Sequence, residues 1–323
     1  MLASALSDVE GLLSSMFLTN VELLDNLIIE LFRNGGKRIR PSVHLAASGL
    51  CNSQGKSCGA PSEESVKVAA ILECIHTASL LHDDVVDNAV TRRGCPSANA
   101  IYGNKVAVLS GDYLINCAFL EALNLPDSEH LSVLIEATRR MSVSEIVQIE
   151  KTGEIALTMT EYENILYGKT VSLFYAACVC ATISTKLPAN KRNALKNYGE
   201  NFGYAFQMTD DLLDYFGKKD NTGKELGTDL DEQKATLPLL LLMKVANITD
   251  KARATQLFKS DAPRSEKLAQ ILPLLEKYDI EKKAADVVHE RIKEAIDSLH
   301  DFPDSEYKDY LVGIAHELNQ RTK

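Results

Sequence analysis

The stretch "ILECIHTASLLHDDVVD", residues 71–87, decides the fold class of this chain. Its apolar residues, like those just before it from Ser65, recur three and four positions apart, which is the period of one face of an α-helix. Three carboxylates then fall within five positions, at Asp83, Asp84 and Asp87. A long apolar helix that ends in clustered acids predicts either a solvated helix end or a metal site beside an apolar cavity.

The same helical spacing recurs along the rest of the chain. It is found in residues 23–32, 112–123, 131–150 and 198–216. No convincing alternation of apolar and polar residues predicts a strand. The breaks between these segments are short and rich in Gly, Pro, Ser, Asn or Asp, and none has the length of an interdomain linker. We therefore expect an all-α fold of roughly ten or more helices, built as one domain over residues 1–323.

Composition limits the classes of function. The net charge of −10 over 323 residues argues against broad nucleic-acid binding, which needs a basic surface, but not against small anionic substrates. The seven cysteines are odd in number and include no Cys-x-x-Cys pair, so we expect a reduced, cytoplasmic setting. The start "MLASALSDVEG" lacks the basic region of a secretory signal. The longest uncharged apolar segment, residues 170–185, is too short and too polar at its ends for a membrane span, so none is expected.

The pattern Asp-Asp-apolar-apolar-Asp occurs twice, as "DDVVD" and "DDLLD". Residues four apart share a helix face, so Asp83 points the same way as Asp87, and Asp210 the same way as Asp214. Like charges at this spacing destabilise a bare helix, and a hard divalent cation offsets their repulsion. Magnesium prefers such oxygen ligands and often bridges carboxylates to substrate phosphates. One cluster alone fits a solvated helix end equally well, whereas two of identical form favour a metal site inside a helical bundle.

A diphosphate substrate also needs cations from the protein, and the chain offers several groups of them. "GGKRIRP", residues 35–41, places Lys37, Arg38 and Arg40 behind two glycines. Arginine binds phosphate with two parallel hydrogen bonds, and lysine acts as a point charge. His76 lies seven residues before Asp83, about two turns along the same helix face, which favours a substrate contact over a packed core histidine. His82 is expected either to be structural or to support neighbouring residues that contact the substrate or metal. Further bases follow later in the sequence: Arg92, Arg93, Lys169, Lys224 and Lys234.

Together these residues resemble the trans-polyprenyl diphosphate synthase family. The resemblance runs in order through "GGKRIRP", "LLHDDVVDNAVTRRG", "YGKT", "FQMTDDLLD" and "GKELGTDLDEQKATLP". Within the family the chain is most similar to bacterial octaprenyl diphosphate synthases, including the ending "LVGIAHELNQRTK". The resemblance implies a helical bundle around a deep central apolar cavity, normally a homodimer, that uses Mg²⁺. Transient contact with a membrane would accompany release of a long product.

The resemblance also implies a role for each motif. The metal ligands would be Asp83, Asp84, Asp87, Asp210, Asp211 and Asp214, with Asp83 and Asp87 as the direct ligands of the first cluster. Isopentenyl diphosphate would be held by Lys37, Arg40, His76 and Arg93. The allylic diphosphate would be held by Arg92, Lys169, Thr170, Gln207, Lys224 and Lys234. The residues implied to be catalytic are Asp83, Asp87, Asp210, Lys169 and Arg92.

Two positions depart from the family pattern. The family commonly has Glu-Gly-Lys where this chain has Gln233 between Glu232 and Lys234. It also commonly has glycine before the glutamate of "EIVQ", where this chain has Ser144. Gln233 is expected to alter the backbone near Lys234, but neither departure removes a charge that the implied chemistry needs.

The implied reaction begins when cations neutralise the allylic diphosphate, so that its C–O bond breaks in a site that excludes water. The isopentenyl double bond then attacks the allylic cation, and a proton leaves to the released diphosphate. Ala78 and Ser79 are small where the family uses bulky residues to stop short chains, so we expect a product near octaprenyl, built from farnesyl diphosphate for quinone side chains. The floor of the tail cavity is expected deeper, at residues that fit an ordinary core equally well: Leu72, Ile75 or Phe119.

Three other functions remain compatible with a helical diphosphate-binding protein. A shorter-chain synthase, making farnesyl or geranylgeranyl diphosphate, differs only in the length of its cavity. A non-catalytic isoprenoid-diphosphate-binding subunit tends to lose carboxylates from an aspartate motif, and here both motifs are intact. A terpene cyclase usually lacks the second aspartate motif and needs no isopentenyl site, whereas Lys37, Arg40 and Arg93 are all present.

Overall fold

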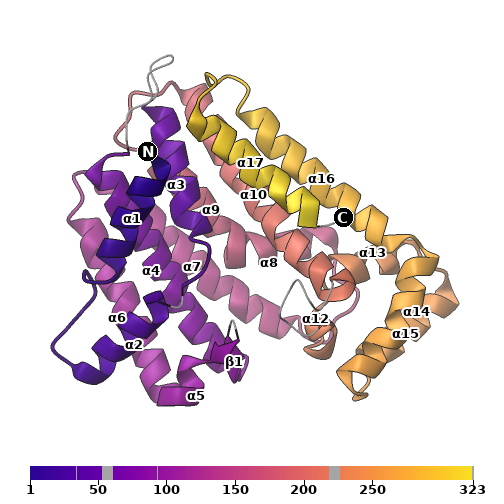
Figure 1. Ribbon diagram of the computed structural model, residues 1–323. Helices are drawn as coiled ribbons and strands as arrows, with labels where there is room; N and C mark the ends of the chain where they lie inside the picture. The colour runs from indigo at the N-terminus through magenta and orange to yellow at the C-terminus, as the bar shows by residue number, and fades with distance from the viewer. Residues whose placement is uncertain (34, 53–60, 93, 218–225, 322–323) are drawn as a thin grey trace. The chain divides into compact units, whose positions relative to one another are not determined.

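The computed structural model describes residues 1–33, 35–52, 61–92, 94–217 and 226–321. Within these ranges the chain is almost entirely helical, which confirms the all-α prediction (Figure 1). The chain divides into two compact units. Unit 1 comprises Met1–Thr138, Leu173–Lys196 and Leu299–Leu311, and unit 2 comprises Arg139–Ser172, Asn197–Ser298 and Val312–Lys323.

Unit 1 is built around helix α4 (Glu63–Val86), the helix that the opening stretch predicts. Helices α6, α3 and α1 pack against it, so α4 is buried along most of its length. Ser62 caps its N-terminus by accepting a hydrogen bond from the backbone N–H of Ser65, and two acids in the first turn favour the positive end of the helix dipole. The other helices here are α1 (Leu2–Leu13), α2 (Glu22–Arg33), α3 (Ile39–Cys51), α5 (Ala98–Tyr102), α6 (Asn104–Leu123), most of α9 (Ser172–Cys180) and the first parts of α7 (Glu129–Glu150), α10 (Ala189–Phe216) and α17 (Glu306–Arg321).

A glycine brings α6 close to α4. A Cβ atom added to Gly111 would lie 2.4 Å from Nε2 of His82, so no larger residue fits without displacing the ring. The same ring nitrogen lies 3.2 Å from the carbonyl oxygen of Val108 and 3.3 Å from a carboxylate oxygen of Asp112. These contacts support the structural alternative for His82.

A short hairpin follows α4 and was not predicted. Strands β1 (Thr91–Arg92) and β2 (Cys95–Pro96) pair antiparallel, with Arg92 opposite Cys95. Two-residue strands are too short to produce a recognisable alternation of apolar and polar residues. The hairpin turns through Gly94, whose φ of +78° favours glycine.

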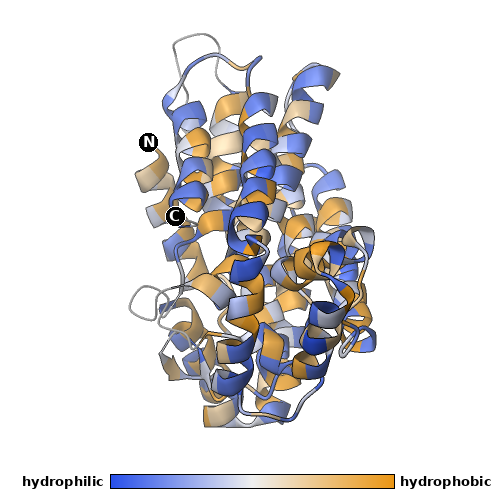
Figure 2. Cartoon of the chain, turned by 90° about the vertical axis from the view of Figure 1, so that its right-hand side faces the viewer, coloured by the Kyte–Doolittle hydropathy of each residue, from blue (hydrophilic) through white to orange (hydrophobic). Residues whose placement is uncertain are grey.

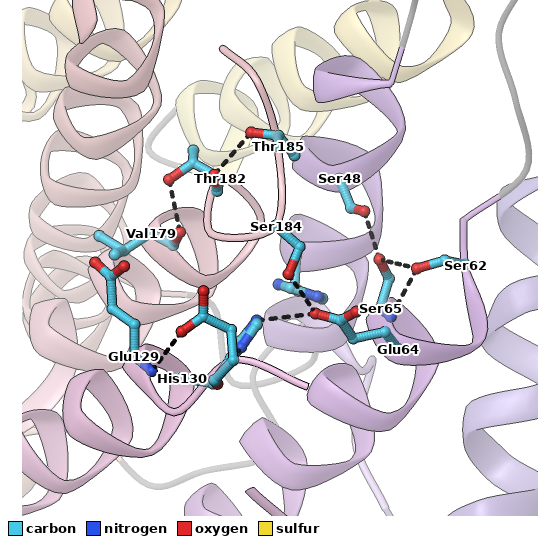
Figure 3. A network of polar contacts seen from close by, with 12 residues as sticks. Ser48, Ser62, Glu64, Ser65, Glu129, His130, Val179, Thr182, Ser184 and Thr185 are labelled. Atoms are coloured by element: carbon cyan, nitrogen blue, oxygen red, sulfur yellow. Dashed lines mark hydrogen bonds and ion pairs between the residues drawn. The ribbon is translucent and has the colours of Figure 1, made fainter. Parts of the chain in front are cut away.

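A polar network joins the N-terminal ends of α4 and α7 to the segment that follows α9 (Figure 3). Glu64 Oε1 accepts a hydrogen bond from the hydroxyl of Ser184 at 2.9 Å and lies 3.6 Å from Nε2 of the buried His130. Beside it, the hydroxyls of Ser48 and Ser65 are 2.5 Å apart. Polar contacts thus join the side chains of Glu64, His130 and Ser184, and those of Ser48 and Ser65, which offsets the cost of placing polar groups between helices.

Unit 2 holds the remaining helices, many of them amphipathic. They are the second part of α7, α8 (Met159–Leu166), η1 (Tyr167–Val171), most of α10, α12 (Thr228–Asp231), α13 (Leu237–Val245), α14 (Ile248–Phe258), α15 (Arg264–Lys277), α16 (Ile280–Ser298) and the end of α17. Figure 2 shows hydrophilic residues in blue and hydrophobic residues in orange on the same helices. Helix α13 packs on α16, and α14 packs on α15. Thr158 and Glu161 form a reciprocal capping box at the start of α8.

One helix among the described residues is long and apolar enough to cross a membrane by length and composition alone. It is α6, with 20 residues, a mean hydropathy of 1.4 and 33% of the apolar window buried. Helices packed in the core of a soluble protein meet the same criterion, and α6 packs on α4. Its outward side nevertheless exposes three leucines, Leu109, Leu120 and Leu123.

Candidate active site

The first aspartate cluster, at the C-terminal end of α4, has one buried carboxylate and two more accessible ones. Asp83 is half-buried and Asp87, the C-cap residue, is exposed. Asp84 is only 2% exposed, and its Oδ1 lies 2.6 Å from both Nε and Nη2 of Arg92. Burial is tolerated for this carboxylate because the arginine on the hairpin pairs with it. Asp83 and Asp87 are thus the more accessible members, as expected of direct metal ligands.

The three cations of "GGKRIRP" lie in different surroundings. Arg38 is 8% exposed, with a left-handed backbone at the start of α3. Its guanidinium lies 2.6 Å from a carboxylate oxygen of Glu10 and 2.9 Å from one of Glu73. This arginine therefore forms ion pairs within the protein that stabilise the fold. Gly35 packs directly on that guanidinium, where a Cβ atom would collide. The guanidinium of Arg40 stacks over the ring of Phe174 at 4.7 Å, and Lys37 is exposed.

A cavity of about 270 Å³ lies within unit 1. Helices α2, α4 and α5 and the hairpin line it, and it brings together His76, Asp84 and Arg92 from the predicted site. Lys37 and Arg40 do not line it. The structure therefore groups one predicted isopentenyl contact with one predicted allylic contact, and leaves Lys37 and Arg40 out of the lining of this cavity.

The second aspartate cluster lies on α10, in unit 2, and its middle member is buried. Asp211 accepts hydrogen bonds from the hydroxyl of Tyr162 and, at 3.0 Å, from Nε2 of Gln207. Burial raises the pKa of Asp211 to about 6, although both hydrogen bonds act to lower it. Asp210 and Asp214 add to the increase by repulsion. Asp211 is therefore held in place by side chains of α8 and of its own helix.

The outer two aspartates of this cluster have other contacts. The carboxylate of Asp214 accepts hydrogen bonds from the backbone N–H groups of Thr228 and Asp229, both at 3.0 Å, and so fixes the start of α12. Oδ1 of Asp210 lies 3.1 Å from Nη2 of Arg321, near the end of the described chain. Burial, with repulsion from neighbouring aspartates, raises the pKa of Asp229 well above its usual range.

A smaller cavity of about 90 Å³, within unit 2, brings three of the six predicted allylic contacts together with one predicted metal ligand. Lys169, Gln207, Asp211 and Lys234 line it. The hydroxyl of Thr170 donates to Oε1 of Gln207 at 2.7 Å. Lys169 and Thr170 lie on η1, a π-helical turn between α8 and α9, a feature that often marks functional sites. The site is thus built from α7, α8, η1, α10 and the segment after α12.

The "EIVQ" motif on α7 holds Lys169. Nζ of this lysine lies 2.9 Å from Oε2 of Glu145 and 2.9 Å from Oε1 of Gln148. Ser144, one of the two departures from the family pattern, is buried against Gly168, where an added Cβ would collide with its hydroxyl. The serine therefore fits because position 168 is glycine.

The other departure places a non-glycine residue in a backbone conformation that favours glycine. Gln233 has a φ of +52°, a left-handed conformation that favours glycine. Its carbonyl oxygen accepts a hydrogen bond from the N–H of Gly153 at 3.0 Å, and the N–H of Lys234 donates to the carbonyl of Asp229 at 2.8 Å. These backbone hydrogen bonds hold the turn that carries Lys234 even though position 233 is not glycine.

Several contacts of the predicted residues were missed from the sequence. They involve Tyr162, Glu145, Gln148, Asp229 and Arg321. Asp229 lies inside a quoted motif, so its acidic side chain was a usable signal, whereas only the fold brings Tyr162 and Arg321 to the aspartates. Two predicted residues, Arg93 and Lys224, lie outside the described residues.

The predicted chain-length residues are partly in the core. Ala78 and Ile75 are fully buried on α4, while Ser79 and, on α6, Phe119 are half-buried. The hydroxyl of Ser79 donates to the carbonyl of His76 at 2.8 Å, so this side chain folds back on its own helix. None of the four lines either cavity described above.

The carboxylate oxygens of the two aspartate clusters suit a hard cation. Among the described residues, no three His, Cys, Asp or Glu side chains are grouped to hold a metal ion by themselves. Each aspartate cluster nevertheless offers carboxylate oxygens only, and Mg²⁺ typically takes one or two carboxylates and keeps several waters and substrate phosphates as its other ligands. The residues present therefore fit magnesium better than a metal that needs nitrogen or sulfur ligands.

The chain is similar to known proteins over most of its length. A family model described as polyprenyl synthetase matches residues 21–275. The octaprenyl diphosphate synthase of Escherichia coli is 32% identical over 99% of this chain and 97% of its own, and that of Haemophilus influenzae is 34% identical over 92% and 88%.

Two solved structures resemble the whole fold. The decaprenyl diphosphate synthase from Rhodobacter capsulatus superposes with a TM-score of 0.91 at 31% identity, covering 100% of this chain and 97% of that one. The polyprenyl synthase from Caulobacter crescentus, complexed with calcium and isoprenyl diphosphate, gives 0.89 at 31% identity, covering 99% and 96%. The chain therefore belongs to the polyprenyl synthetase family, and is a polyprenyl diphosphate synthase that elongates isoprenoid chains as a trans-prenyltransferase.

Proposed function

We propose that this enzyme extends farnesyl diphosphate by successive head-to-tail condensation with isopentenyl diphosphate, to an all-trans product near octaprenyl that supplies the side chain of ubiquinone. The observation that carries the long product is the lack of bulk one turn before the first aspartate cluster. Ala78 is buried, and the hydroxyl of Ser79 folds back on its own helix. The relatives from E. coli and H. influenzae, both octaprenyl diphosphate synthases, support this length.

The two aspartate clusters would hold magnesium on the allylic diphosphate. The proposed ligands are Asp83, Asp84, Asp87, Asp210, Asp211 and Asp214. Magnesium, when bound, would neutralise charge on the departing diphosphate. The calcium in the Caulobacter crescentus complex supports a divalent cation in this fold. Asp84 would act chiefly through Arg92, because its carboxylate already pairs with that guanidinium.

Lys169 is proposed to stabilise the negative charge that develops as the allylic C–O bond breaks. Glu145 and Gln148 hold its ammonium group in one position before substrate binds, and a preorganised charge lowers the barrier more than a mobile one. The other proposed allylic contacts are Arg92, Thr170, Gln207, Lys224 and Lys234. The proposed isopentenyl contacts are Lys37, Arg40, His76 and Arg93.

The remaining chemistry requires no covalent intermediate with the protein. The isopentenyl double bond attacks the allylic cation, and the released diphosphate accepts the proton that leaves. Apolar side chains around the allylic tail would exclude water, because hydrolysis would otherwise consume the cation. The chain's own residues therefore bind, orient and neutralise, and none acts as a nucleophile.

We further propose a cytoplasmic homodimer with one domain per chain and brief membrane contact during product release. The exposed Leu109, Leu120 and Leu123 on α6 support a dimer, because a second copy would cover apolar surface on a helix that otherwise meets water. The bacterial relatives from E. coli and H. influenzae support the cytoplasmic location. Sedimentation of the purified chain tests the assembly.

Product sizing tests the proposed reaction. Purified protein is incubated with farnesyl diphosphate, excess labelled isopentenyl diphosphate and magnesium, and the products are measured by mass spectrometry. We expect a narrow distribution centred near octaprenyl. Products that stop at geranylgeranyl length would show a shorter-chain synthase. No incorporation from either farnesyl or geranylgeranyl diphosphate would contradict elongation by this chain.

A further inference from the structure

The 270 Å³ cavity of unit 1 lies on a side of α4 that the proposed tail path does not use. Helix α4 lines it with a single stripe of residues spaced three and four apart: Glu73, His76, Thr77, Leu80, Leu81 and Asp84. At 100° per residue, Ile75 and Ala78 fall on the opposite side of the helix. The growing chain and this cavity would therefore flank different faces of α4.

The walls of this cavity suit the apolar body of a small molecule. Leu27 and Leu31 of α2, Ile101 of α5 and Pro96 of the hairpin line it together with α4. Its volume is just below the roughly 300 Å³ at which pockets for drug-sized ligands begin. A molecule somewhat smaller than a typical drug-sized ligand therefore fits that space.

The charges around the cavity select a single negative group on the ligand. Arg38 and Arg92, two of the arginines that line it, are paired with Glu73 and Asp84. The side chain of the third, Arg33 in the last turn of α2, makes no hydrogen bond or ion pair within the part of the chain that the structure describes. A carboxylate can pair with Arg33, whereas the acids in the same lining would repel a multiply charged diphosphate.

The cavity also contacts three residues of the proposed reaction: His76, Asp84 and Arg92. The side chain of Arg92 is 35% exposed and that of Asp84 is 3% exposed, and both line the cavity. An apolar molecule beside this ion pair would displace water from it. Because an ion pair strengthens as the local dielectric falls, Arg92 would then stay on Asp84 and bind the allylic diphosphate less tightly.

We propose that this cavity is a regulatory site for a small molecule with an apolar body and one carboxylate, of the medium-chain fatty acid type, and that its occupancy raises the KM for the allylic diphosphate. The coupling, though not the binding, rests on the proposed role of Arg92. Binding and coupling are therefore tested by separate measurements.

Binding is measured on the full chain with decanoate, which competes with the fluorescent monoanion 1-anilinonaphthalene-8-sulfonate. Saturating farnesyl diphosphate and magnesium are present, without isopentenyl diphosphate, so that the tail cavity is occupied. We expect one competing site in wild type and a Kd for decanoate at least about tenfold higher in Arg33→Glu, the scale of a lost charged hydrogen bond. Leu31→Phe, which fills the cavity, should also weaken binding. Ile29→Phe, on the exposed side of α2, is the matched control.

Unchanged decanoate affinity in both Arg33→Glu and Leu31→Phe would overturn the site. Loss of the decanoate signal when farnesyl diphosphate is added would overturn it as well, because the fatty acid would then occupy the tail cavity. Neither result depends on turnover, so this measurement stands apart from the proposed function.

Coupling is measured as kcat and KM for farnesyl diphosphate, with and without saturating decanoate. We expect decanoate to raise KM at least threefold in wild type, with kcat nearly unchanged, and to leave KM unchanged in Leu31→Phe. An unchanged wild-type KM while decanoate is bound would refute the regulatory role. No turnover even without decanoate would instead count against the proposed function.

Discussion

Acidification should destabilise this protein through one buried histidine, His44 on α3. Nδ1 of His44 lies 2.8 Å from the carbonyl oxygen of Ala177, and the residue is 1% exposed. Burial lowers its pKa to about 4, although the hydrogen bond to Ala177 acts to raise it, and His130 contributes by repulsion. The unfolded chain has a pKa of about 6.5 for histidine. Between these two values the unfolded state binds a proton that the folded state rejects.

The sign and size of the effect follow from linkage. Stability from the neutral His44 is complete above a pH of about 6.5, is lost progressively as the pH falls, and levels off below about 4. Each pKa unit corresponds to about 1.4 kcal/mol, so moving from about pH 7.5 to about pH 4.5 should cost roughly 2.5 kcal/mol. This is a large fraction of the usual stability of a folded domain, about 5 to 15 kcal/mol.

The assay is urea denaturation followed by helical circular dichroism, at about pH 7.5 and about pH 4.5, for wild type and His44→Gln. Glutamine stays neutral and keeps a donor for the Ala177 carbonyl. The change in stability that the substitution itself causes is the same at both pH values. It therefore cancels when the stability difference between the two proteins is compared across pH. We expect the stability gap between the two proteins to narrow by roughly 2.5 kcal/mol at the lower pH.

A matched control is His300→Gln, because the side chain of His300 is 77% exposed. We expect no comparable narrowing for that variant. An equal pH dependence in wild type and His44→Gln would refute the reasoning, because the lost stability would then come from other groups.

Three further predictions concern the site. Asp83→Ala and Asp210→Ala should each lower kcat about a hundredfold or more, the scale of losing one preorganised electrostatic group, with unchanged circular dichroism; near-normal turnover in both would contradict the metal assignment. Glu145→Gln should lower kcat about two- to fivefold, because Lys169 loses the ion pair that holds it in position. An unchanged kcat in steady-state kinetics would contradict this preorganising role of Glu145. Gln233→Gly should raise the free energy of unfolding by up to about 1 kcal/mol. The left-handed backbone costs a non-glycine residue about 1 to 2 kcal/mol, and part of this gain is offset because glycine loses more conformational entropy on folding. A lower urea midpoint for the variant would contradict this prediction.

Features that depend on residues close together along one helix were predictable from the sequence. The predicted helix over 65–87 corresponds to α4, Glu63–Val86, within the usual uncertainty of helix ends. The aspartate clusters also lie on helices, since a four-residue spacing on an apolar helix is a local signal.

Features that depend on long-range packing were not predictable. Arg38 sits between two substrate-type cations in the sequence, and only the packing of α1 and α4 shows that Glu10 and Glu73 take it as a structural partner. The hydrogen bond from Tyr162 to Asp211 spans 49 positions, and no spacing rule reaches that far. The hairpin that carries Arg92 back to Asp84 was missed because its strands are two residues long.

The π-turn at Tyr167–Val171 makes the length of "YGKT" as important as its letters. A π-turn holds an extra residue that the regular hydrogen-bond ladder cannot absorb. Deleting one residue there would restore the ordinary ladder and leave the helix beyond it in nearly its present phase, because the wide turn already accommodates the extra residue. The wide turn itself, which carries Lys169 and Thr170, would be lost. A one-residue deletion in this motif is therefore expected to preserve the flanking helices while removing the local geometry of the site.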